Sequence, residues 1–191
     1  MGMKKLILIC VVLLLSFKSL FAFTYNNDPH LFITELVNDA INTLSDKNLG
    51  IEEKEEFIEK VAIENVDINA LGLYTLGELR KTTDKDTLIN YQNTFKKYFL
   101  KSLTSRLTDY SSNKFEIVGS DKKSSNYTIV NSRIAESLKS PEIKIDWRVY
   151  TKNPDNPLIR DLIIEGLSLA RTQKEEFASI LSSNNNDINF L

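Results

Sequence analysis

The feature that most constrains the fold is a long amphipathic repeat in the middle of the chain. Apolar residues recur there at steps of three or four, at Leu88, Tyr91, Phe95, Phe99, Leu103, Leu107 and Tyr110. This spacing predicts one helix over residues 84–110, about 40 Å long at the usual rise per residue. A helix of that length must cross the whole body of a small domain.

Helical patterns precede this repeat. Asp28 followed by Pro29 is typical of a helix start, because aspartate caps and proline tolerates the first helical position. A second helix is predicted after Gly50, and a third, short one over residues 67–76.

Strand patterns follow the repeat. The apolar period changes to two, which predicts four strands, at residues 115–118, 127–134, 143–151 and 158–169. In the third of these, Ile145, Trp147 and Val149 face one way. Residues 172–175 form a capping-box pattern that predicts the start of a last helix. Helices segregated from strands in this way predict an α+β fold.

The first 22 residues have the order of a secretory signal peptide. Lys4 and Lys5 precede an unbroken apolar run over residues 6–15, and Phe21-Ala22 follows. Ten apolar residues make about 15 Å of helix, half of what a membrane span needs. We therefore expect cleavage after Ala22, export to the periplasm, and a single mature domain at residues 23–191.

The mature composition excludes several classes of protein. Removing residues 1–22 takes away three lysines and no acid, which leaves 21 basic and 26 acidic residues and a net charge of −5. A mildly acidic domain without a basic cluster argues against nucleic acid as a partner. The single cysteine, Cys10, lies in the leader, so neither a disulfide nor thiol chemistry is expected in the mature chain.

Candidate catalytic groups are few. His30 is the only histidine, no Cys/His grouping suggests a metal site, and no glycine-rich phosphate loop occurs. Asp161 and Glu165 are four residues apart on the last predicted strand, which places both carboxylates on one face. Such a pair is either a solvated face or an acid/base pair, and the sequence leaves both open.

Three stretches together resemble the MlaC family of periplasmic phospholipid-binding proteins, also called the toluene-tolerance family. They are residues 66–77, the aromatic helix segment around Phe95, Tyr98 and Phe99, and the segment from Asp161 through Ser168, which contains Glu165-Gly166-Leu167. The similarity spans about residues 28–190. One departure lies before the last strand, where the family's W-x-x-Y-D is replaced by residues 157–161, with Arg160 in the place of the tyrosine.

The resemblance implies a fold and a role. The expected fold is a strongly curved antiparallel sheet of four to five strands with helices packed on it, an NTF2-like roll enclosing an apolar cavity. The expected role is a monomeric carrier without cofactor. It would shuttle phospholipid between an outer-membrane lipoprotein complex and an inner-membrane ABC transporter with a ring-forming MCE-domain subunit. This transport would maintain the lipid asymmetry of the outer membrane.

The apolar phases of the elements, combined with that fold, predict which residues line the cavity: Leu71, Leu76, Tyr91, Phe95, Phe99, Leu103, Trp147, Val149, Ile163 and Leu167. Two alternatives remain open. In one, the roll is a small-molecule enzyme with Asp161 or Glu165 as its base. In the other, the protein is an adaptor with a solid core that binds other proteins and no lipid.

Overall fold

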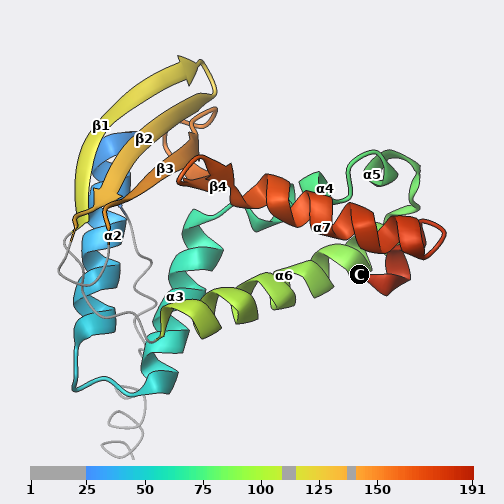
Figure 1. The fold of residues 1–191 in the computed structure, drawn as a ribbon, viewed down its shortest axis with the longest axis horizontal. Coiled ribbons are helices and arrows are strands. Elements are labelled where there is room, and N and C mark those ends of the chain that lie inside the picture. Colours follow the sequence, from blue (N-terminus) through green and yellow to red (C-terminus); the bar gives the residue numbers. More distant parts are fainter. Residues whose placement is uncertain (1–24, 109–114, 137–140) are drawn as a thin grey trace, which may run out of the picture.

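The computed structural model describes residues 25–108, 115–136 and 141–191. In these residues the first half is helical, a meandering sheet follows, and one helix closes the chain (Figure 1). The α+β prediction is confirmed, and the predicted signal peptide lies outside the described residues. The helices are α2 (Pro29–Ser45), α3 (Ile51–Asn65), α4 (Ile68–Thr75), α5 (Leu79–Thr82), α6 (Lys85–Leu107) and α7 (Leu169–Ser183), with a short 3₁₀ turn η1 (Ile188–Phe190). No helix in these ranges is both long enough and apolar enough to cross a bilayer.

The predicted helix starts before α6 are confirmed by their caps. The Asp28 carboxylate accepts hydrogen bonds from the backbone N–H groups of His30 and Leu31, and Pro29 is the first helical residue. Asp67 caps α4 in the same way through the Ala70 N–H. At the start of α3, which Gly50 precedes, the cap comes from a glutamate in the first turn.

The predicted long helix is α6, which is unbroken over 23 residues, about 35 Å, while its predicted end at Tyr110 lies outside the described residues. Asp84 caps it by accepting from the Thr87 N–H. The helix packs on α3 and α4. At Gly72 of α4 the contact is so close that a Cβ atom would lie 2.9 Å from the Phe95 ring, so only glycine fits there without a shift of the aromatic side chain.

The sheet has five antiparallel strands in sequence order: β1 (Phe115–Ser124), β2 (Tyr127–Ile134), β3 (Ile143–Tyr150), β4 (Leu158–Ile164) and β5 (Leu167–Ser168). Each strand pairs with the next, and the outer strands do not pair with each other, so the sheet stays open. It curves over the helices (Figure 1). Shifts in register next to Val118 in β1 and next to Arg160 in β4 mark β-bulges, which increase local twist and bend.

The last predicted strand and the last predicted capping box were partly wrong. The strand ends at Ile164, because Glu165 and Gly166 both have positive φ, 49° and 82°, and form a two-residue turn into β5. Helix α7 then starts at Leu169, capped by Ser168, whose hydroxyl accepts from the Arg171 N–H. The proposed box at residues 172–175 therefore lies within the helix.

Two apolar clusters hold the helices in place. In one, α2 packs against the inner face of the sheet through fully buried residues such as Ile33, Val130 and Val149. In the other, α3, α4, α6 and α7 meet around Phe95, whose ring is edge-on to that of Phe177. A pocket is lined by residues of both clusters.

Candidate binding pocket

A pocket of about 610 Å³ lies between α6 and the inner face of the sheet. Its size is that of pockets that hold small ligands, about 300–1,000 Å³. Its walls come from α2, α3, α4, α6, α7 and four of the strands, and most of the side chains are apolar. Its lining residues on the helices before α6 are Leu36, Val37, Ala40, Ile41, Leu44, Phe57, Ile58, Val61, Ala62, Leu71 and Thr75, with Val66 between α3 and α4.

Helix α6 presents two parallel rows to the pocket, each with a step of four residues. The inner row is apolar: Phe95, Phe99, Leu103 and Leu107. The second row is polar, and consists of Tyr98, Ser102 and Arg106. Tyr98 and Arg106 are exposed, as are Thr172 and Glu176 of α7, which also line the pocket. The pocket therefore opens to solvent along the polar row.

The sheet wall is mostly apolar, with Asp161 of β4 as the charged side chain in its lining. Ile145 and Trp147 of β3 line the pocket, as the alternation in the sequence predicts. The Ser132 hydroxyl of the neighbouring strand β2 accepts from Trp147 Nε1 at 2.9 Å and donates to the Ile145 carbonyl at 2.7 Å. The Ser132 hydroxyl, next to this wall, therefore has both a donor and an acceptor inside the protein.

Of the ten predicted cavity residues, five line the pocket and five do not. Those in the lining are Leu71, Phe95, Phe99, Leu103 and Trp147. Of the others, Leu76 and Tyr91 are buried in the cluster around Phe95, and Val149 in the cluster around α2. Ile163 lies on β4 outside the lining, and Leu167 is 69% exposed on β5.

The bulge in β4 explains the difference at Ile163. Val149 pairs with Ile159 and the preceding Arg148 pairs with Asp161, so one extra residue is inserted and the alternation of faces shifts. Leu162 and Ile164 line the pocket instead. A plain period of two cannot reveal such a shift.

Much of the lining was missed because it comes from α2 and α3. Leu36 and Val37 of α2 and Phe57 and Val61 of α3 lie on faces that the sequence shows to be apolar. Helical periodicity identifies a buried face, but it does not tell whether that face meets a neighbouring element or an open space. The sequence pattern therefore could not show that α2 and α3 border the pocket.

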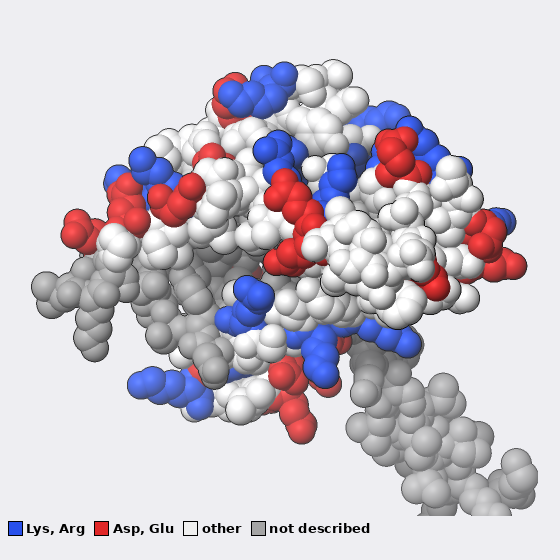
Figure 2. All heavy atoms as spheres, turned by 45° about the vertical axis from the view of Figure 1, so that its right-hand side comes forward, with Lys and Arg blue, Asp and Glu red and all other residues white. Residues whose placement is uncertain are grey.

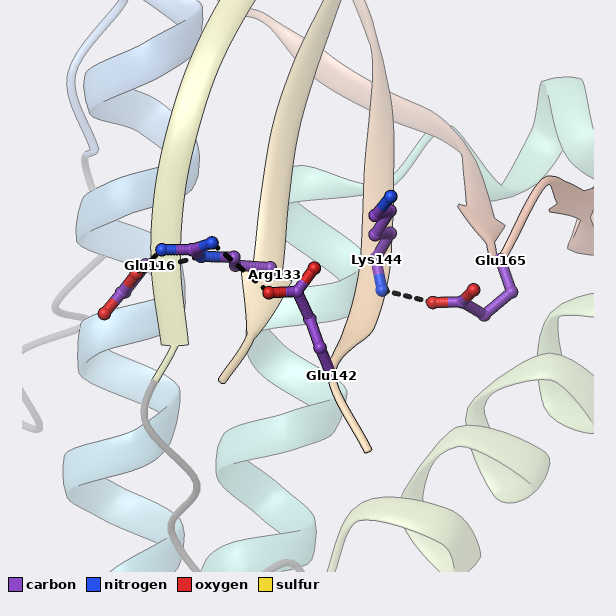
Figure 3. Close-up of polar contacts among 5 residues, drawn as sticks. All are labelled: Glu116, Arg133, Glu142, Lys144 and Glu165. Atoms are coloured by element: carbon purple, nitrogen blue, oxygen red, sulfur yellow. Dashed lines mark hydrogen bonds and ion pairs between the residues drawn. The ribbon is translucent and has the colours of Figure 1, made fainter. Parts of the chain in front are cut away.

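The prediction that Asp161 and Glu165 share a face was wrong, because the chain turns at Glu165. The Glu165 carboxylate is exposed and accepts from the Lys144 backbone N–H near the start of β3 (Figure 3). Asp161 is 4% exposed. Its two oxygens accept from the Ser168 hydroxyl at 2.6 Å and from the Ala170 N–H at 3.0 Å. Asp161 thus fastens the start of α7 to β4.

Arg160, which replaces the tyrosine of the family pattern, ties the sheet to α4. Its guanidinium donates to the Asp67 carboxylate at 2.7–2.8 Å and to the Tyr127 hydroxyl at 2.9 Å, and lies 3.4 Å from the centre of the Tyr150 ring. Burial alone lowers the pKa of Arg160, but the bonds to Tyr127 and Asp67 outweigh it and the pKa is raised. The departure from the family therefore has a structural role of its own.

Charges on the surface are mixed in sign. At the end of the sheet, Arg133 of β2 lies between Glu116 of β1 and Glu142, and pairs with both (Figure 3). Figure 2 shows acidic and basic side chains interspersed over the visible face, without a broad field of one sign. In the described parts of the chain, no group of three or more histidine, cysteine, aspartate or glutamate residues is placed to hold a metal ion.

Fold and pocket together define the class: an α+β protein built around a mostly apolar, ligand-sized space whose exposed lining residues include a polar row on α6. Comparison with family models gives the family. Residues 34–189 match the model described as "MlaC protein", and the chain belongs to this family. The predicted family is thereby confirmed.

A solved structure shares the fold. It is a phospholipid-binding protein from Ralstonia solanacearum, in complex with a phospholipid, and it superposes with a TM-score of 0.67. The two sequences are 17% identical over 83% of this chain and 89% of that one. A search of the curated proteins found no match.

Proposed function

We propose that this protein is a periplasmic phospholipid carrier that buries acyl tails in the pocket between α6 and the sheet. The observation that carries the proposal is the pocket itself, about 610 Å³ in volume, apolar inside and open along one polar rim. An amphiphile fits this division, with tails inside and headgroup at the rim. Membership of the MlaC family and the phospholipid bound by the Ralstonia protein support the same reading.

The energetics explain why a carrier needs such a space. Exposing acyl chains to water costs about 0.8 kcal/mol per methylene, so two chains of about 15 carbons cost on the order of 20 kcal/mol. Protein walls that replace lipid around the tails remove most of this cost. Leu71, Phe95, Phe99, Leu103 and Trp147 are the predicted residues that would contact the tails directly.

The finer role is part of the proposal. The mature domain, residues 23–191, acts in the periplasm as a monomer after removal of the signal peptide. It takes lipid from one Mla complex and delivers it to another, between an outer-membrane lipoprotein complex and the MCE-domain ring of an inner-membrane ABC transporter, and so maintains outer-membrane asymmetry. In this role the open sheet and the helices form an NTF2-like roll that closes around the cargo.

Neither alternative is favoured by a specific observation. An enzyme would need a carboxylate free to take a proton in the pocket, whereas Asp161 is held by Ser168 and Ala170, and Glu165 lies outside the lining. The family and its phospholipid-binding neighbour suggest binding or transport rather than catalysis. An adaptor would need a filled interior, and this interior is open.

The test is lipid extraction and mass spectrometry of protein purified from its native compartment, with a variant that fills the pocket. Ala40→Trp places a large side chain in the lining, and Ala178→Trp places the same side chain on the exposed face of α7 as a control. Wild-type and Ala178→Trp proteins should carry phospholipid, and Ala40→Trp should carry little. Wild-type protein without lipid, or equal loading of the two variants, would contradict the proposal.

A further inference from the structure

The polar row of α6 has a feature that apolar burial does not explain. Among the described residues that line the pocket, three side chains carry charge: Arg106, Asp161 and Glu176. Asp161 is held by Ser168 and Ala170, and Glu176 accepts from Gln173 Nε2 at 3.1 Å. Arg106 has neither an ion pair nor a hydrogen bond to another side chain in the described parts of the chain.

The side chain one turn before Arg106 also has no hydrogen-bond partner among the described residues. The Ser102 hydroxyl lines the pocket and makes no hydrogen bond to a described residue, although neighbouring hydroxyls on the same helix bond back to the main chain. Side chains four residues apart on a helix lie about 5–6 Å apart at their Cβ atoms. Two donors that reach one site, a hydroxyl and a guanidinium, therefore stand together at the rim.

The third residue of the row is already engaged. The Tyr98 hydroxyl donates to Gln173 Oε1 of α7 at 3.0 Å, which closes the rim at that end by a contact between the two helices. The open part of the rim is thus the segment that Ser102 and Arg106 occupy. A ligand whose tails fill the apolar row places its first polar group beside them.

From this arrangement, and resting on the proposed function, we infer that Ser102 and Arg106 bind the phosphate of the cargo lipid. Guanidinium is planar, remains charged at all working pH values and matches two phosphate oxygens at once, and a serine hydroxyl can donate to a third. An arginine can lay its aliphatic stem along apolar surface while its charged head stays in water, which suits Arg106 as an exposed residue at a mostly apolar lining. The carrier then distinguishes lipids with a phosphate from neutral lipids with the same tails, while any substituent beyond the phosphate projects into solvent.

The test is a competition between lipids that differ only in the phosphate. Delipidated protein is offered equal amounts of a phospholipid and a diacylglycerol with identical acyl chains, and the bound ratio is measured by native mass spectrometry. The variants are Arg106→Gln and Ser102→Ala. Lys101→Gln is the matched control, since it removes one positive charge from an exposed position on the same helix outside the lining.

We expect wild-type and Lys101→Gln proteins to prefer the phospholipid. The bound ratio of phospholipid to diacylglycerol should be about tenfold lower in Arg106→Gln, and reduced by less in Ser102→Ala. Equal binding of the two lipids by the wild type, or equal preference in Arg106→Gln and Lys101→Gln, would overturn the inference and leave the proposed function standing. Failure of the wild type to bind either lipid would overturn both.

A second arm separates lipid phosphate from free phosphate. Inorganic phosphate alone, titrated into the delipidated protein by calorimetry, should give no saturable heat, because the tails supply most of the binding free energy. Saturable binding of inorganic phosphate that Arg106→Gln abolishes would mean that the pair serves a free anion, and would overturn the assignment to the cargo.

Discussion

Replacing Asp161 with alanine removes the carboxylate that fastens α7 to the sheet. In the wild type this group is 4% exposed and accepts two hydrogen bonds, from the Ser168 hydroxyl at 2.6 Å and the Ala170 N–H at 3.0 Å. Hydrogen bonds to a charged group contribute about 1.5–3 kcal/mol each, and the donors left behind are partly buried. Arg148, 3.7 Å away, is largely exposed and adds little.

We therefore expect Asp161→Ala to lower the free energy of unfolding by about 3 kcal/mol or more, and the melting temperature by roughly 6–12 °C. Asp161→Asn keeps one acceptor oxygen and should lose about half as much. Urea denaturation followed by circular dichroism measures both. Asp155→Ala, in an exposed turn, is the control and should stay within about 0.5 kcal/mol of the wild type. Equal stability of Asp161→Ala and this control would show that the two hydrogen bonds of Asp161 contribute nothing to the fold.

Three further outcomes follow from the packing. Gly72→Ala, whose new methyl would lie 2.9 Å from the Phe95 ring, should lose about 1–3 kcal/mol in chemical denaturation, whereas Gly119→Ala, with open space around it, should lose none; equal effects would contradict the close contact. Burial raises the pKa of Tyr91 from 10.0 to about 12. The free energy of unfolding should therefore be full below pH 10 and fall as the pH rises toward 12. An equal loss of stability over this pH range in Tyr91→Phe would exclude this residue as the cause. Arg160→Lys keeps the positive charge but not the planar guanidinium, and should lower the free energy of unfolding by about 1–2 kcal/mol in the same denaturation assay. An unchanged midpoint would show that the bonds to Asp67 and Tyr127 contribute nothing.

The sequence predicted most of the elements because their signals are local. Asp28, Asp67 and Asp84 cap the helices that they were expected to start, and the alternation around Trp147 places β3 correctly. Capping and alternation depend on a residue and its near neighbours along the chain. Such signals survive whatever the tertiary packing does.

The errors lie where backbone conformation departs from the regular pattern. A positive φ at Glu165 is not marked in the sequence, so the last strand was predicted to run on to residue 169 and the last helix to start at residue 172 instead of Leu169. The bulge beside Arg160 exchanged the faces of β4, which moved Leu162 and Ile164 into the lining in place of Ile163. The first error follows from a residue with positive φ, and the second from one extra residue in a strand that was otherwise predicted correctly.

The lining itself was predictable only in part. Tyr91 and Phe95 lie on the same stripe of α6, yet Tyr91 is enclosed by the helical cluster and bonds to Thr75, while Phe95 borders the pocket. Apolar periodicity selects both equally. Which of them meets an open space depends on how α4 and α7 are placed, and the contacts that decide this join residues far apart in the sequence.

The most direct measurement of the central claim uses Trp147, the single tryptophan of the chain, which lines the pocket. Phospholipids with bromine on the acyl chains quench tryptophan fluorescence only when the bromine is in near contact. If acyl tails occupy this pocket, chain-brominated phospholipid should quench Trp147, and unlabelled phospholipid with the same headgroup should not. Binding of the brominated lipid without quenching would place the tails elsewhere and contradict the account.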